Sequence, residues 1–207
     1  RKFAAENPQE VAYETKSIVY LDKNLSLFDA ILDLAHELTH YTEREGFNPY
    51  AKNFNIAEFI HSTVEGKGGE VIAYLRECQI MQELFPAMLE KRSHCLKVLD
   101  EEKGEFSREL AIKLFYRVGE YIGEFKHLQD EGKIISSQLP QLSAQTPIFY
   151  SSAYGLPYPL AAVKEFQSIM QKVCQNDKKR ISLIQERLAA GTSRSIATAN
   201  ENCQSFR

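Results

Sequence analysis

The stretch His36-Glu37-Leu38-Thr39-His40 is the most informative part of the chain for its fold and function. On a helix, His36 and His40 lie one turn apart on the same face, where two imidazoles can bind one zinc ion. Glu37 follows the first histidine, and its carboxylate can accept a proton from a nearby water molecule. Burying these groups among leucines is costly unless they are paired or bind a metal. The stretch therefore predicts a metal site on a helix.

A strand, a turn and a helix are predicted around this stretch. Residues 16–21 have β-branched and aromatic side chains at their centre, which favours a strand. Residues 22–24 would end it, and Ser26 is a candidate helix N-cap with Asp29 as its capping-box partner. The helix that follows has a broad apolar face, composed of Leu27, Phe28, Ile31, Leu32, Leu34, Ala35 and Leu38. We therefore expect the histidines on a largely buried helix.

With its H-E-x-x-H pattern in this context, the chain resembles the zincin metallopeptidases. The resemblance implies one zinc ion per chain, with His36 and His40 among its ligands. It also implies that Glu37 is the general base, which activates the zinc-bound water for attack on a peptide carbonyl. The expected function is zinc-dependent hydrolysis of peptide bonds in a peptide or protein substrate. The resemblance rests on residues 36–40, extends from Lys16 to about Phe85, and does not reach the C-terminal half.

A catalytic zinc usually has a third protein ligand. Glu43 and Gly46 stand where the metzincin extension needs a glycine and a histidine, so that extension is absent. Glu70 follows two glycines at the start of an apolar-periodic helix, and with Ala73 it forms a Glu-x-x-Ala pattern. This pattern resembles the second helix of glutamate-type zincins (gluzincins), in which a glutamate completes the site and a small residue lets two helices pack closely. The resemblance implies that Glu70 is the third ligand.

Other roles for the neighbouring acidic residues stay open. Glu70 can be a carboxylate that faces the helix macrodipole, and Glu65 or Glu77 can take the ligand role. Glu65 is expected in a loop, whereas Glu77 shares the face of Glu70 and can hydrogen-bond a ligand histidine. Tyr74 stands where thermolysin-like enzymes carry an aspartate, which leaves the hydrogen-bonding partner of the histidines undecided.

Two alternative functions compete with the peptidase. Glu-x-x-His occurs at Glu37–His40, Glu58–His61 and Glu124–His127, and di-iron carboxylate helix bundles use two such pairs. That class would be an oxidase or an iron-storage protein. A catalytically inactive zincin-fold binding module is the other alternative, although its expected mark, a broken motif, is absent.

Residues 148–159 are a second candidate region for function. They contain three tyrosines, a glycine and two prolines outside any expected helix. Zincins often use a tyrosine to hydrogen-bond the developing oxyanion, and Tyr154, followed by Tyr150, is the preferred candidate. The alternative is that these tyrosines pack a proline-rich loop onto the helices.

The chain of 207 residues, 43% of them hydrophobic, is long enough for one domain with a substantial core. We expect a mainly α fold, with a zincin-like helical domain over 1–190, a small N-terminal β element and a polar tail over 191–207. Helices are expected near 55–64, 69–84, 86–99, 106–129 and 159–190, and a non-helical segment near 131–158. The net charge of −3 does not favour nucleic-acid binding, and no apolar run is long enough for a membrane span.

The four cysteines predict disulfides in an exported protein. None of them has the C-x-x-C spacing of a zinc knuckle. A bond from Cys174 to Cys203 would tether the tail, and Cys78 to Cys95 would join neighbouring helices. We therefore expect a periplasmic or secreted protein, and four reduced thiols in a cytosolic protein are the alternative.

Overall fold

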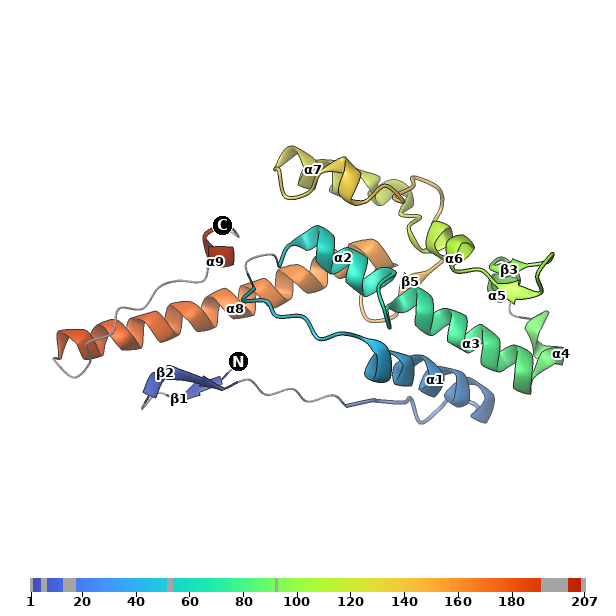
Figure 1. Ribbon diagram of the computed structural model, residues 1–207, viewed down its shortest axis with the longest axis horizontal. Coiled ribbons are helices and arrows are strands. Elements are labelled where there is room, and N and C mark those ends of the chain that lie inside the picture. Colours follow the sequence, from blue (N-terminus) through green and yellow to red (C-terminus); the bar gives the residue numbers. More distant parts are fainter. Residues whose placement is uncertain are drawn as a thin grey trace. The chain divides into compact units, whose positions relative to one another are not determined.

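The computed structural model describes residues 2–4, 7–12, 18–51, 54–91, 93–190 and 201–205 of the chain (Figure 1). These residues are mainly helical, which confirms the predicted mainly α fold. The elements in chain order are β1 (Lys2–Ala4), β2 (Asn7–Ala12), α1 (Leu27–Glu43), α2 (Ile56–Val64), α3 (Glu70–Leu84), α4 (Pro86–Leu89), α5 (Ser93–Leu96), β3 (Leu99–Asp100), β4 (Glu105–Phe106), α6 (Arg108–Phe115), η1 (Gly119–Tyr121), α7 (Ile122–Asp130), η2 (Ser136–Gln138), β5 (Tyr150–Ser151), β6 (Leu156–Pro157), α8 (Tyr158–Ala189) and α9 (Glu201–Ser205). The strands pair in antiparallel twos, β1 with β2, β3 with β4 and β5 with β6.

The chain divides into two compact units. One unit comprises Arg1–Ile18, Phe47–Phe54 and Glu165–Arg207, and the other comprises Val19–Gly46 and Asn55–Lys164. The second unit contains the whole H-E-x-x-H stretch and the acidic residues expected to complete its site. We call it the motif unit and the first the α8 unit.

Helix α1 begins where the sequence predicts. The Ser26 hydroxyl accepts a hydrogen bond from the Asp29 amide at 3.1 Å and donates one to the Asp29 carboxylate at 2.7 Å. The helix packs along α3 (Figure 1). Its Leu32 side chain is fully buried with Cys78, Met81 and Cys95. The predicted Cys78–Cys95 disulfide is formed in this core and joins α3 to α5. The site-bearing faces of α1 and α3 are thus fixed by a shared apolar core.

The strand predicted at 16–21 is wrong for the part that the structure describes. Residues 18–21 are irregular, and Ile18 and Tyr20 are 54% and 82% exposed, whereas Lys16 and Ser17 lie outside the described residues. β-Propensity acts only where a neighbouring strand or packed face is present, and these side chains face solvent. The N-terminal β element is instead the β1–β2 pair.

Two predicted helices are interrupted because their backbones bond elsewhere. The helix predicted over 86–99 is replaced at its end by β3, which pairs with β4. The turn between these two strands contains Gly104, whose φ is +67°. In 106–129, the Val118 amide donates to the Ser143 carbonyl at 2.9 Å, and Gly119 takes a φ of +57°. Left-handed glycines suit both turns and end the helical periodicity.

The other predicted helices agree with the observed elements. Helices over 55–64, 69–84 and 159–190 correspond to α2, α3 and α8, and no α-helix lies between α7 and α8 in the described part. Of the expected tail, residues 191–200 and 206–207 lie outside the description, and 201–205 form α9. Among the helices described here, none combines the length and apolarity that a membrane span requires.

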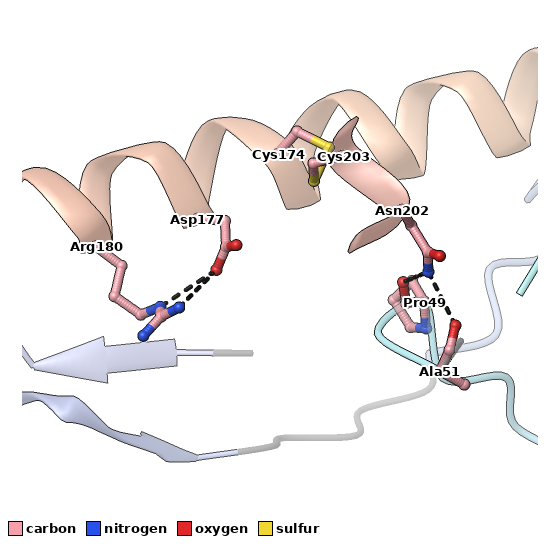
Figure 2. The surroundings of a disulfide bond; sticks show 7 residues. All are labelled: Pro49, Ala51, Cys174, Asp177, Arg180, Asn202 and Cys203. Atoms are coloured by element: carbon pink, nitrogen blue, oxygen red, sulfur yellow. Dashed lines mark hydrogen bonds and ion pairs between the residues drawn. A yellow bond between two sulfur atoms is a disulfide. The ribbon is translucent and has the colours of Figure 1, made fainter. Parts of the chain in front are cut away.

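The α8 unit is held by the second predicted disulfide. Cys174 on α8 is bonded to Cys203 on α9 (Figure 2). The neighbouring Asn202 amide donates to the carbonyls of Pro49 and Ala51 at 3.1 and 2.9 Å. The disulfide and these bonds tie α9 both to α8 and to the segment around Pro49.

Candidate metal centre

Helices α1 and α3 bring three predicted ligands together. His36 Nε2 lies 3.3 Å from one carboxylate oxygen of Glu70, and His40 Nε2 lies 3.6 Å from the other. One donor atom from each residue can be chosen so that all three lie within 4.8 Å of one another. Each of the three side chains is only about 15% exposed. The sequence-predicted set of His36, His40 and Glu70 is therefore one compact, mostly buried cluster.

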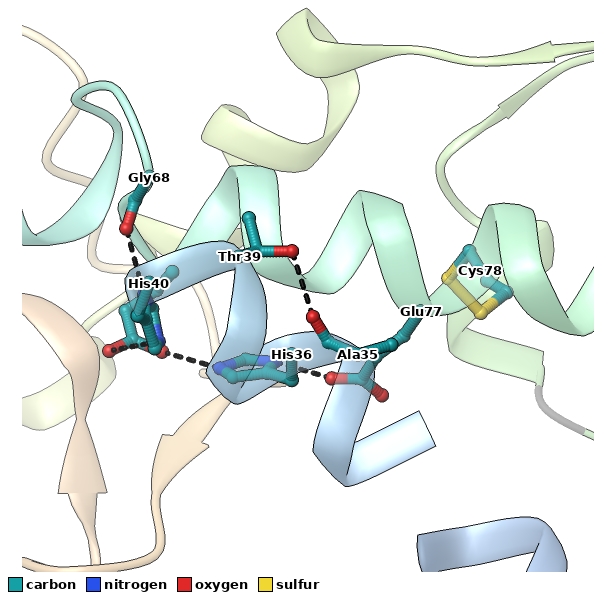
Figure 3. Close-up of polar contacts among 9 residues, drawn as sticks. Ala35, His36, Thr39, His40, Gly68, Glu77 and Cys78 are labelled. Atoms are coloured by element: carbon teal, nitrogen blue, oxygen red, sulfur yellow. Dashed lines mark hydrogen bonds and ion pairs between the residues drawn. A yellow bond between two sulfur atoms is a disulfide. The ribbon is translucent and has the colours of Figure 1, made fainter. Parts of the chain in front are cut away.

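The outer nitrogens of both imidazoles already have partners (Figure 3). His36 Nδ1 lies 2.5 Å from Glu77 Oε1, and His40 Nδ1 lies 2.8 Å from the Gly68 carbonyl oxygen. Both oxygens are acceptors, so they hold a proton on Nδ1 and turn Nε2 toward Glu70. Two Nε2 atoms and one carboxylate form a donor set that zinc accepts, and each imidazole has the outer partner usual for a ligand histidine. The residues present therefore fit a zinc ion.

The glycines before α3 bring the chain this close to α1. A Cβ on Gly68, whose φ is +62°, would stand 2.7 Å from the Glu43 carbonyl carbon and closer still to the Arg44 nitrogen. A side chain there would push the Gly68 carbonyl away from His40. Gly69 then caps α3, and Glu70 is the first residue of that helix. The loop thus sets the partner of one histidine and the position of the expected third ligand.

The cluster is strongly coupled electrostatically. Burial by itself would lower the pKa of His36, but hydrogen bonds and charge interactions with Glu70 and Glu77 outweigh it and raise the pKa to about 10. Burial would likewise raise the pKa of Glu70, but its bonds to His36 and His40 lower it to about 2. Without a metal, a protonated His36 therefore lies between two carboxylates. A bound cation would replace the proton on Nε2.

Glu37 lies beside the cluster without belonging to it. Its side chain is half-buried on α1, and it is not part of the group whose donor atoms converge. Its negative charge acts on Tyr158, which also interacts with Glu70 and Glu77. Glu37 is thus near the ligands and leaves its carboxylate available for proton transfer.

Tyr158 is a site residue that the sequence analysis did not select. It is the first residue of α8, and its ring packs against Phe115 at 5.1 Å between centroids. Burial, followed by the charges of Glu70 and Glu77 and a hydrogen bond to Glu70, raises the pKa of Tyr158 far above its usual value. Its hydroxyl therefore keeps its proton and can donate it in a hydrogen bond.

Tyr150 and Tyr154, the tyrosines preferred from the sequence, lie in the β5–β6 hairpin and are 48% and 43% exposed. The available signal for Tyr158 was the proline that follows it. Proline is common in the first turn of a helix, so Pro159 marks the start of α8 and a fixed backbone position for Tyr158.

The remaining Glu-x-x-His pairs point to solvent. His61 and His127 are 55% and 69% exposed, and each lies near the glutamate four residues later. Within the described ranges, His36, His40 and Glu70 form the one group of metal-binding side chains that converges. Glu65, the competing ligand, instead accepts a hydrogen bond from Tyr116.

None of the protein-family models, curated proteins or solved structures that were compared with this chain matches it.

Proposed function

We propose that the protein is a zinc-dependent metallopeptidase. The observation that carries the proposal is the orientation of the two imidazoles: both Nδ1 atoms are bonded outward, and both Nε2 atoms face the Glu70 carboxylate. His36, His40 and Glu70 would hold the ion. Zinc, when bound, would polarise the substrate carbonyl and make a water molecule easier to deprotonate at neutral pH.

Glu37 and Tyr158 supply the groups that move or hold protons. Glu37 is the residue after a ligand histidine, where its carboxylate can take a proton from water and pass it to the leaving amine. Tyr158 keeps its phenolic proton beside Glu70, so it can donate a hydrogen bond to the substrate carbonyl oxygen as that oxygen gains negative charge. Together these roles support hydrolysis of a peptide bond.

The two disulfides support a location outside the cytosol. Cys78–Cys95 and Cys174–Cys203 use all four cysteines of the chain. Such bonds persist mainly in oxidising compartments. We include export to the periplasm or the exterior in the proposal, with peptides or proteins as substrates.

The first test is metal content, measured by mass spectrometry on protein purified without added metal. We expect about one zinc per chain, its loss in His36→Ala, and its retention in His61→Ala, which changes an exposed histidine. About two irons per chain, lost in His61→Ala, would favour the di-iron alternative. An absence of metal even after zinc is supplied would refute the proposal.

The second test separates catalysis from metal binding. Glu37→Gln should retain zinc and lose cleavage of a fluorogenic peptide mixture, because the amide cannot accept the proton. Glu58→Gln, a change on an exposed part of α2, is the matched control and should retain both properties. Full activity in zinc-loaded Glu37→Gln would contradict the mechanism.

A further inference from the structure

Tyr116 and Glu65 form a buried, hydrogen-bonded pair, and Glu65 begins the loop whose Gly68 carbonyl contacts His40. We propose that Tyr116 and Glu65 are positioning residues of the metal centre, acting through loop 65–69 on His40 and Glu70. This inference rests on the proposed zinc site and concerns residues outside its ligand set.

The pair is buried and satisfied by its own hydrogen bond. Tyr116 is fully buried directly after α6, and its hydroxyl donates to Glu65 Oε1 at 2.9 Å. The Glu65 side chain is only 12% exposed. Placing a phenol and a carboxylate in a core costs free energy unless they bond each other. The hydrogen bond fixes where each side chain lies, because either group would be buried without a partner if it moved away from the other.

Glu65 is held through its backbone as well. The Arg108 guanidinium, on the first residue of α6, donates to the Glu65 carbonyl oxygen at 2.6 Å. The Glu65 amide donates to the His61 carbonyl oxygen at 3.0 Å. The residue that ends α2 is therefore fixed to α6 by its side chain and its carbonyl.

The loop transmits this fixed position to the metal ligands. It closes through a hydrogen bond from the Gly69 amide to the Gly66 carbonyl at 2.9 Å. Gly66 and Gly69 pack so tightly that a Cβ on either would come within 2.8 Å of the end of α2. At its other end the loop presents the Gly68 carbonyl to His40 Nδ1 and leads directly into Glu70. A displacement of Glu65 would therefore move both the partner of His40 and the start of α3.

Helix α6 supports the other side of the centre too. Phe115 packs on Tyr158, while its neighbour Tyr116 bonds Glu65. Phe115 and Tyr116 are adjacent in the chain, so one segment contacts both Tyr158 and the loop that leads to Glu70. This arrangement favours a positioning role over a contribution to core stability alone.

The test uses Tyr116→Phe, which removes only the hydroxyl. Zinc affinity is measured by competition with a chromophoric chelator, and the geometry of the centre by the visible spectrum of the cobalt-substituted protein. We expect a roughly tenfold loss of zinc affinity, at the low end of the effect of residues that bond metal ligands, together with a changed cobalt spectrum. Tyr121→Phe, five residues later, is the matched control and should change neither measurement.

A second variant guards against misfolding. Arg108→Ala changes an exposed side chain and removes its bond to the Glu65 carbonyl, so it should lower zinc affinity in a folded protein. Tight zinc binding with an unchanged cobalt spectrum in both variants would overturn the positioning role and leave the zinc site standing. A wild-type chain that binds no zinc would overturn the site and the inference together.

Discussion

Without metal, the stability of the motif unit should fall as the pH rises from 7 to 9. The pKa of His36 is about 10 in the folded protein and near 6.5 in the unfolded chain. Between these values the folded state holds one proton more than the unfolded state, so the free energy of unfolding decreases with pH. The contribution of His36 is complete below pH 6.5 and is lost as the pH passes through about 10.

The expected size of this effect follows from the same two pKa values. Each pH unit in that interval is worth at most about 1.4 kcal/mol, which gives about 2–3 kcal/mol between pH 7 and pH 9 once partial titration of the unfolded chain is included. Glu70 acts in the opposite direction: its pKa falls to about 2, so its contribution is present above pH 4.5 and is lost on acidification below that value. The site therefore stabilises the metal-free fold most between pH 4.5 and pH 6.5.

The assay is urea unfolding in the presence of a chelator at pH 7, 8 and 9. His36→Gln removes the titrating group and should flatten the pH dependence, whereas His61→Gln, at a 55% exposed position, should leave it unchanged. With excess zinc the wild-type dependence should weaken or reverse, because the ion binds the deprotonated imidazole. The same steep decrease in wild type and His36→Gln would refute the proton bridge between His36, Glu70 and Glu77.

Three further predictions concern single residues. Gly68→Ala should lower zinc affinity, measured by chelator competition, because its Cβ collides with the end of α1. Gly132→Ala is the control: Gly132 has a φ of +69° and no atom near its Cβ position, so this change should cause only backbone strain. Tyr158→Phe should lower kcat about a hundredfold or more at unchanged zinc content, as expected for loss of an oxyanion donor, and Tyr154→Phe should not. Leu32→Ala should cost about 2–5 kcal/mol in urea unfolding, because the side chain is fully buried.

The histidine pair and the start of α1 were predictable because each depends on local sequence, whereas the place of Glu70 was implied by the resemblance of its Glu-x-x-Ala pattern to the gluzincins. Helical spacing places His36 and His40 on one face, and Ser26 with Asp29 forms a cap whose atoms are three residues apart. The roles of Tyr158 and the Gly68 carbonyl were not predictable. Both depend on contacts between distant segments, and a backbone carbonyl leaves no mark in side-chain identity. The strand expected at 16–21 was wrong where described because propensity alone supplies no pairing partner.

The proton bridge and the proposed metal site share His36 Nε2 and the Glu70 carboxylate, and this explains how the cluster stays assembled without a cation. Glu70 and Glu77 place two negative charges around His36, and the proton on that imidazole balances one of them. A divalent ion that displaces the proton adds one net positive charge, which neutralises the second carboxylate. The charge of Glu77 therefore opposes metal binding by holding the proton and favours it by balancing the ion. Glu77→Gln should weaken both effects. The two effects partly cancel at pH 7, so the substitution should change zinc affinity less at pH 7 than at pH 9, where the proton is easier to displace.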